Sequence, residues 1–210
     1  SAGNCFPPPK TIGEMARVLK IPLTADIEGG YSDDLAMVGE TIRGVIGAGA
    51  VGINFEDGAR SPDLHARKIE TVRQAAAESG VPLFINARID VYLKGLAKDE
   101  AALDETLRRA ELYRAAGADG IFVPGPTDET LLATLAGKIA LPLNVMGRGG
   151  MAPAAKLQTL GVRRLSSATA PFRVAYAALG RAVETYLADG DASALADAGK
   201  GAPELNARFG

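Results

Sequence analysis

The sequence predicts an α/β protein built as a parallel (β/α) barrel. Short apolar segments of strand length alternate with longer amphipathic segments, and the strand–helix unit repeats every ~20–37 residues. Three of the short segments open with the same pattern, spaced sixty residues apart, at Ile21-Pro22-Leu23, Val81-Pro82-Leu83 and Leu141-Pro142-Leu143. A regular unit of this length favours a closed barrel of the (β/α)₈ type over an open, doubly wound sheet.

The elements can be placed in order along the chain. Three consecutive prolines at 7–9 predict a loop or extended start over residues 1–10, because proline is excluded from the helix interior. Six strands are expected, near 22–28, 51–56, 82–88, 119–123, 141–145 and 162–166. Helices follow from the 3.6-residue periodicity, and most begin near Ser, Asp or Thr and end before Gly. They are expected at 11–20, 33–47, 63–79, 99–116, 128–138, 152–160 and 171–188.

An eight-stranded barrel needs two more strands than these six, and typically about 250 residues. The C-terminal end has a complete helix at 171–188 followed by a tail, so the deficit falls at the N-terminus. Either about two N-terminal strands are missing, or the barrel is open there. We expect a barrel domain over 1–188 and a C-terminal tail over 189–210 that docks on a neighbouring subunit.

The composition narrows the class of protein. Hydrophobic residues make up 47% and charged residues 23%, as in ordinary soluble globular proteins. A net charge of −2 argues against nucleic acid or an anionic membrane as the main partner. No apolar run approaches the ~20 residues of a membrane span, and no signal-peptide pattern is present. The single cysteine, Cys5, suits a cytoplasmic protein, and the single histidine, His65, argues against a His-rich metal site. We expect His65 at the surface of a helix.

Acidic residues gather where two neighbouring strands end. Asp26 and Glu28 are two residues apart, so strand alternation predicts that both point to one face. Glu56 ends the next strand. Three carboxylates without a histidine suit a hard cation such as Mg²⁺ or Mn²⁺, bound directly or through water. For Asp26 and Glu28, the alternative to a metal site is a solvated strand end that is followed by an ordinary turn at Gly29-Gly30.

An arginine and two asparagines end other strands at the same rim. Arg88 could hold a substrate carboxylate in a bidentate fork or stabilise a developing enolate oxygen. Its structural alternative is an ion pair with Asp90 or Glu56. Asn86 and Asn144 are expected to contact the substrate, because the carboxyl ends of barrel strands build the active site.

The ordered set of motifs resembles the isocitrate lyase / phosphoenolpyruvate mutase superfamily over residues 20–180. The motifs are Thr24-Ala25-Asp26-Ile27-Glu28-Gly29-Gly30-Tyr31, Gly52-Ile53-Asn54-Phe55-Glu56-Asp57-Gly58, Phe84-Ile85-Asn86-Ala87-Arg88-Ile89-Asp90, Gly117-Ala118-Asp119-Gly120-Ile121-Phe122-Val123-Pro124-Gly125 and Leu141-Pro142-Leu143-Asn144-Val145. The resemblance implies a (β/α)₈ TIM barrel of the phosphoenolpyruvate-binding type that uses Mg²⁺ on 2-oxo or related carboxylic acids. It also implies that Ser1, Ala2 and Gly3 form a loop that grips the substrate.

By the same resemblance, Asp26, Glu28 and Glu56 fall at metal positions, and Arg88 and Glu56 at catalytic ones. The sequence departs from the family in lacking the Lys-Lys-Cys-Gly-His loop of the isocitrate lyases and in carrying Pro124 where the mutases have histidine. We therefore expect a Mg²⁺-dependent lyase that cleaves a C–C bond of a small 2-oxo or hydroxy acid through an enolate-type intermediate. The alternatives are an oxaloacetate decarboxylase, a P–C bond enzyme, or a non-catalytic 2-oxo-acid-binding protein.

A homo-oligomer, most simply a homotetramer, is expected from the C-terminal helix. Residues 171–188 carry more apolar side chains than an outer helix needs on one face. Relatives in the superfamily exchange their last helix between subunits, and the resemblance implies the same here.

Overall fold

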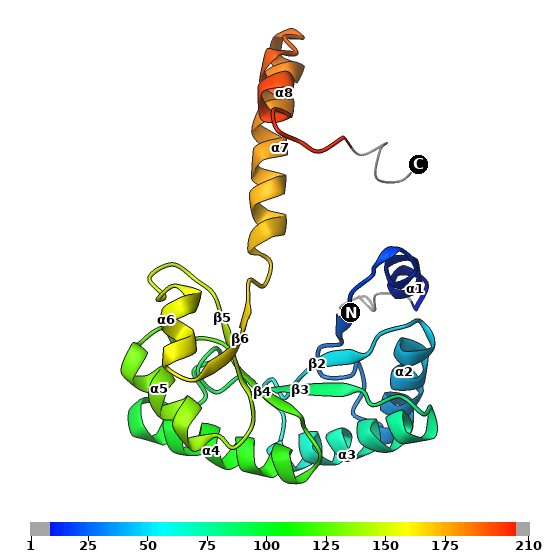
Figure 1. The fold of residues 1–210 in the computed structure, drawn as a ribbon, viewed down its shortest axis with the longest axis vertical. Coiled ribbons are helices and arrows are strands. Elements are labelled where there is room, and N and C mark those ends of the chain that lie inside the picture. Colours follow the sequence, from blue (N-terminus) through cyan, green and yellow to red (C-terminus); the bar gives the residue numbers. More distant parts are fainter. Residues whose placement is uncertain (1–8, 205–210) are drawn as a thin grey trace. The chain divides into compact units, whose positions relative to one another are not determined.

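A computed structural model describes residues 9–204, which fall into two compact units divided between Ser166 and Ser167. The first unit holds a six-stranded parallel sheet whose strands are ordered as they occur in the chain (Figure 1). The strands are β1 (Thr24–Asp26), β2 (Gly52–Glu56), β3 (Phe84–Arg88), β4 (Gly120–Val123), β5 (Leu143–Met146) and β6 (Val162–Ser166). This arrangement confirms the predicted α/β fold of the barrel type, with β1 and β6 as the two edges of the sheet.

Helices connect the strands and follow one another around the outside of the curved sheet (Figure 1). The connecting helices are α2 (Leu35–Gly47), α3 (Pro62–Glu78), α4 (Asp99–Ala115), α5 (Glu129–Lys138) and α6 (Ala154–Thr159), and α1 (Pro9–Val18) precedes β1. Side-chain caps start two of them: Asp34 accepts from the backbone N–H of Ala36, and Asp128 accepts from that of Leu131. Such caps satisfy N–H groups that have no partner inside the helix.

The core lies between the sheet and these helices. Its members are apolar residues from the helix-facing side of the strands and the strand-facing side of the helices, such as Ile53, Ile85, Ile42 and Val72, all fully buried. The periods of two and of 3.6 residues predicted this division correctly, since each places one apolar face toward the other layer.

The first helix begins earlier than the sequence predicted. Residues 1–10 were expected to be a loop or extended because of their prolines, yet α1 starts at Pro9. Proline is tolerated in the first turn of a helix, where its missing N–H would have no partner. The predicted start at residue 11 was therefore wrong by two residues.

The second unit contains α7 (Ala170–Asp189) and α8 (Ser193–Ala198), which pack on each other. Gly190 ends α7 in the left-handed conformation, with φ of 77°, which glycine adopts without strain. Ala182 is the one buried residue of α7. The division after Ser166 assigns this helix to the second unit, and the predicted barrel domain over 1–188 with a tail over 189–210 stays a prediction. No helix among residues 9–204 is long and apolar enough to cross a membrane.

Candidate active site

Side chains of the sheet alternate between two faces, and this alternation locates the candidate site. Ile53, Phe55 and Ile85 are fully buried beneath the helices. The residues between them therefore point to the opposite face, which we call the inner face. Near the carboxyl ends of the strands, the register aligns one inner-face residue from each of five strands. This set, the inner row, consists of Glu56, Arg88, Phe122, Asn144 and Arg164.

Two further carboxylates lie at the β1 edge. Asp26 is in register with Asn54, and its Oδ2 accepts from Asn54 Nδ2 at 3.5 Å. Glu28 lies two residues beyond β1 with a φ of 52°, and its backbone N–H donates to Asp26 Oδ1 at 3.0 Å. Strand alternation does not extend into this turn, so it does not by itself fix the direction of the Glu28 side chain. The Glu28 carbonyl accepts from Glu56 N at 2.8 Å, which keeps the turn beside the inner row.

The acidic residues form no ready-made metal cluster. Within the part of the chain that the structure describes, no group of three or more His, Cys, Asp or Glu side chains is arranged to hold a metal ion. Mg²⁺ commonly binds through one or two carboxylates, with waters and substrate oxygens completing its shell. The exposed carboxylates of Asp26 and Glu28 meet that smaller requirement.

Arg88 is the most connected residue of the inner row. Its Nη1 lies 2.8 Å from Glu56 Oε2, its Nε donates to Asp90 Oδ1 at 2.7 Å, and its Cζ lies 5.8 Å from the centre of the Phe122 ring. Burial by itself lowers the pKa of Arg88, but the hydrogen bond and charge of Asp90, with the charge of Glu56, more than reverse the effect and raise it. The ion pairs that the sequence offered as the structural alternative for Arg88 are both present.

Glu56 is held in an environment that disfavours its charge. Burial is the main cause that raises the pKa of Glu56, and the negative charges of Asp90 and Glu28 act in the same direction. Arg88 opposes the shift, as does Lys94, whose Nζ lies 3.9 Å from Glu56 Oε1.

A buried network behind the inner row fixes Asp90. Asp57 is fully buried, and its Oδ1 accepts from the Asp90 N–H at 2.9 Å. Its Oδ2 accepts from Arg109 Nη1 at 2.8 Å and from the Tyr113 hydroxyl at 2.7 Å, both on α4. The position of Arg88 therefore depends, through Asp90 and Asp57, on a helix on the outer side of the sheet.

The two predicted asparagines are both 1% exposed. Asn86 Nδ2 donates to Asn54 Oδ1 at 2.9 Å on the inner face. Asn144 Oδ1 accepts from the Ser166 hydroxyl at 3.1 Å, while Asn144 Nδ2 has no hydrogen-bond partner among the described residues. An unsatisfied buried donor costs about 1–3 kcal/mol, so Asn144 has unused capacity for a substrate that reaches it.

A buried lysine holds the turn after β1. Lys68, on α3, has a fully buried side chain, and its Nζ donates to the Gly29 carbonyl at 3.0 Å and to Asp33 Oδ1 at 2.6 Å. Arg60 Nε donates to the same carboxylate oxygen at 2.9 Å. The sequence argument overlooked Lys68, although its spacing from Val72 places it on the apolar face of the helix.

His65 is 1% exposed, so its expected surface position was wrong. Its ring packs 4.6 Å from Phe55 and 4.8 Å from Tyr113, measured between ring centres. Burial lowers the pKa of His65 to about 3, so the ring is neutral at physiological pH. The predicted substrate loop of Ser1, Ala2 and Gly3 lies outside the described residues.

Comparison with known proteins identifies a family and several relatives. The family model for phosphoenolpyruvate phosphomutase matches residues 9–187. A Mycobacterium tuberculosis (strain CDC 1551) protein of uncharacterised activity is 35% identical over 158 residues, covering 73% of this chain and 57% of that protein. An oxaloacetate decarboxylase of Ectopseudomonas mendocina is 28% identical over 154 residues, covering 71% of this chain and 53% of the enzyme. The chain thus spans little more than half the length of these curated relatives.

Solved structures share the architecture. A provisionally assigned phosphonomutase from Burkholderia cenocepacia J2315 aligns with a TM-score of 0.80 and 39% identity, over 84% of this chain and 74% of that chain. A phosphonopyruvate hydrolase in complex with oxalate and Mg²⁺ aligns with a TM-score of 0.81 and 20% identity, over 98% of this chain and 76% of that one. At that identity, the second similarity establishes the fold alone.

Proposed function

The chain belongs to the phosphoenolpyruvate phosphomutase family, and from this membership we propose that it is a Mg²⁺-dependent carbon–carbon lyase. Its substrate would be a small 2-oxo or hydroxy carboxylic acid, cleaved through an enolate-type intermediate. The observation that carries the proposal is the inner face itself, where exposed Asp26 and Glu28 lie beside the paired Glu56 and Arg88. Fold alone would not support an activity, because one fold hosts many.

Each residue has a role that follows from its surroundings. Asp26 and Glu28 would hold the cation, with Glu56 joining directly or through water. When bound, Mg²⁺ supplies a Lewis acid that polarises the 2-oxo group. Arg88 presents a planar guanidinium, already oriented by Asp90, to the oxygen on which negative charge develops as the bond breaks. Asn86 and Asn144, with Ser1, Ala2 and Gly3, would contact the rest of the substrate.

Binding calorimetry tests the metal assignment directly. We expect Asp26→Ala to weaken binding of Mg²⁺ in the presence of oxalate, because the variant loses an exposed carboxylate of the proposed site. Asp104→Ala is the matched control, since Asp104 is an exposed carboxylate on α4, outside the inner face. Equal affinity in the Asp26→Ala variant and the parent would show that the cation is held elsewhere.

Two other activities have support of their own. An oxaloacetate decarboxylase is supported by the curated relatives with that name, and a P–C bond enzyme by the phosphonomutase-like structure. A non-catalytic 2-oxo-acid-binding protein is the alternative from another class. Steady-state assays with malate-type hydroxy acids, oxaloacetate and phosphonopyruvate separate the three activities. A binding protein would gain thermal stability from ligand and Mg²⁺ but turn nothing over.

Oligomeric state and location complete the proposal. The apolar side chains of α7 support a homotetramer, because Phe172, Val174, Tyr176 and Leu187 are between 60% and 75% exposed. Large apolar side chains exposed in this number on one helix are typical of a surface that is covered by a partner. A cytoplasmic location fits a chain whose single cysteine forms no internal disulfide.

A further inference from the structure

An irregularity in β6 decides which of its residues face inward. The register pairs Leu143 with Val162 but the next residue, Asn144, with Arg164. Arg163 is therefore an extra residue on β6, as in a β-bulge, which reorients the side chains that follow. In a regular register without the bulge, Arg163 would pair with Asn144. Because of the bulge, Arg164 pairs with Asn144 and belongs to the inner row.

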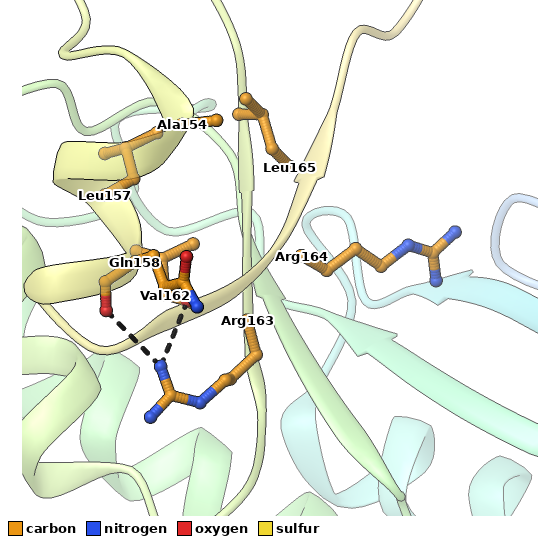
Figure 2. Close-up of a pocket in the computed structure, with 7 residues that line it drawn as sticks. All are labelled: Ala154, Leu157, Gln158, Val162, Arg163, Arg164 and Leu165. Carbon is orange, nitrogen blue, oxygen red and sulfur yellow. Dashed lines mark hydrogen bonds between the residues drawn. The ribbon is translucent and has the colours of Figure 1, made fainter.

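The two neighbouring arginines differ in their contacts (Figure 2). Arg163 Nη1 lies 3.3 Å from the Val162 carbonyl and 3.5 Å from the Gln158 carbonyl. Both arginines line a cavity of about 350 Å³ between α6 and β6. Arg164 extends in another direction, away from α6. Its guanidinium makes no hydrogen bond or ion pair within the described residues and is only partly exposed.

This state of Arg164 is unlike that of the other arginine in the inner row. Arg88 is neutralised by the carboxylates of Glu56 and Asp90. Arg164 has no anionic side chain bonded to it within the described residues. The inner face is thus acidic at the β1 and β2 end and basic at the β6 end, with the paired Arg88 between them.

We propose that Arg164 binds a second anionic group of the substrate, at the end of the molecule farthest from the metal. This inference rests on the proposed function, and it narrows the substrate class to extended dianions. Neighbouring strands lie about 4.8 Å apart, so the three steps from Arg88 to Arg164 span roughly 14 Å along the sheet. Because the sheet is curved (Figure 1), long side chains on its inner face converge, so the gap between the two guanidinium groups is shorter than this span. A 2-oxo dicarboxylate fits it better than a monocarboxylate.

The test compares two ligands that share a 2-oxo acid head, pyruvate and 2-oxoglutarate, by calorimetry with saturating Mg²⁺. The parent protein should bind 2-oxoglutarate more tightly, because only this ligand carries a second carboxylate. Arg164→Gln should weaken 2-oxoglutarate roughly tenfold to hundredfold, the range for a hydrogen bond to a charged group. It should leave the affinity for pyruvate unchanged. Arg164→Lys should restore part of the loss, since it restores the charge.

Arg163→Gln is the matched control, because it removes an adjacent arginine that contacts backbone carbonyls away from the inner face. It should change neither affinity. Thermal midpoints should match the parent for all Arg164 variants, since this side chain has no partner to lose. Equal weakening of both ligands by Arg164→Gln, or no weakening of 2-oxoglutarate, overturns the role of Arg164 while leaving the proposed function standing. Failure of the parent protein to bind either ligand overturns the proposed function and the role of Arg164 with it.

Discussion

Replacing Arg88 by methionine removes the cation shared by two carboxylates, and the structure sets the size of the effect. The carboxylate of Asp90 is 0% exposed and that of Glu56 is 11% exposed. Removing one partner of a buried ion pair costs about 3–5 kcal/mol, and here Lys94, 3.4 Å from Asp90 and 3.9 Å from Glu56, is left as the one cation for both carboxylates among the described residues. For a chain of this size, that loss lowers the thermal midpoint by roughly 6–20 °C.

Lysine at the same position separates the structural role from the catalytic one. Arg88→Lys keeps the positive charge but loses the planar fork, so it should destabilise the fold less than Arg88→Met. Its catalytic cost should be large, about 2.7–4 kcal/mol, or roughly a hundred- to thousandfold in turnover. Denaturant unfolding gives the first quantity, and kcat on the best substrate of the panel gives the second.

The control is Arg114→Met, since Arg114 pairs with Glu111 in an exposed position on α4. It should leave both stability and turnover unchanged, because exposed pairs contribute little. A normal unfolding midpoint for Arg88→Met would refute the argument from buried carboxylates. An Arg88→Lys variant that is strongly destabilised yet keeps its rate per folded molecule would show that Arg88 is only structural.

Three other predictions concern stability and assembly. Asp57→Ala should cost about 3–5 kcal/mol in denaturant unfolding, because it removes one of the two carboxylates that pair with Arg109 and leaves the buried Tyr113 hydroxyl and Asp90 N–H without their acceptor, whereas Glu111→Gln at an exposed position on α4 should cost nothing measurable. Burial lowers the pKa of His65 to about 3, so between pH 3 and 6.5 the unfolded chain binds more protons than the folded chain. The free energy of unfolding therefore decreases as the pH falls through this range, by up to about 1.4 kcal/mol per pH unit. His65→Gln should flatten this slope in unfolding curves recorded across the same range. Serine at Phe172 and Tyr176 should lower the mass found by light scattering, and a monomeric parent would disprove the proposed tetramer.

The fold could be predicted from the sequence because its signals are local and repeated. Strand and helix periodicities, Asp caps and Gly after the helices each depend on a few neighbouring residues. The predicted element boundaries were wrong where a single residue alters the local backbone conformation. Pro9 starts a helix that the run of prolines hid, and Glu28 takes a left-handed φ that ends β1 two residues early.

The candidate site could be predicted only in part. The carboxyl ends of parallel strands meet at one edge, so the strand positions of Asp26, Glu56 and Arg88 were enough to predict that they lie near one another; their roles stay predictions. Arg164 was missed because its direction depends on a bulge, which no periodicity reveals. Arg109 and Tyr113 were missed because they contact Asp57 from α4. The sequence pattern did not predict which face of that helix packs on the sheet.

The contacts also divide the inner face into a fixed centre and two adjustable ends. Arg88 is held by Asp90, and the Asp57 carboxylate in turn accepts a hydrogen bond from the backbone N–H of Asp90. Its geometry is therefore set before any ligand arrives, which is what stabilising a developing charge requires. At the β1 end, Asp26 is exposed. At the β6 end, the Arg164 guanidinium has no partner within the described residues. When ligands bind, the side chains that become ordered should be Asp26, which binds the cation, and Arg164, which binds the distal anion. Arg88, which lies nearest the reacting bond, should keep the position it has without ligand.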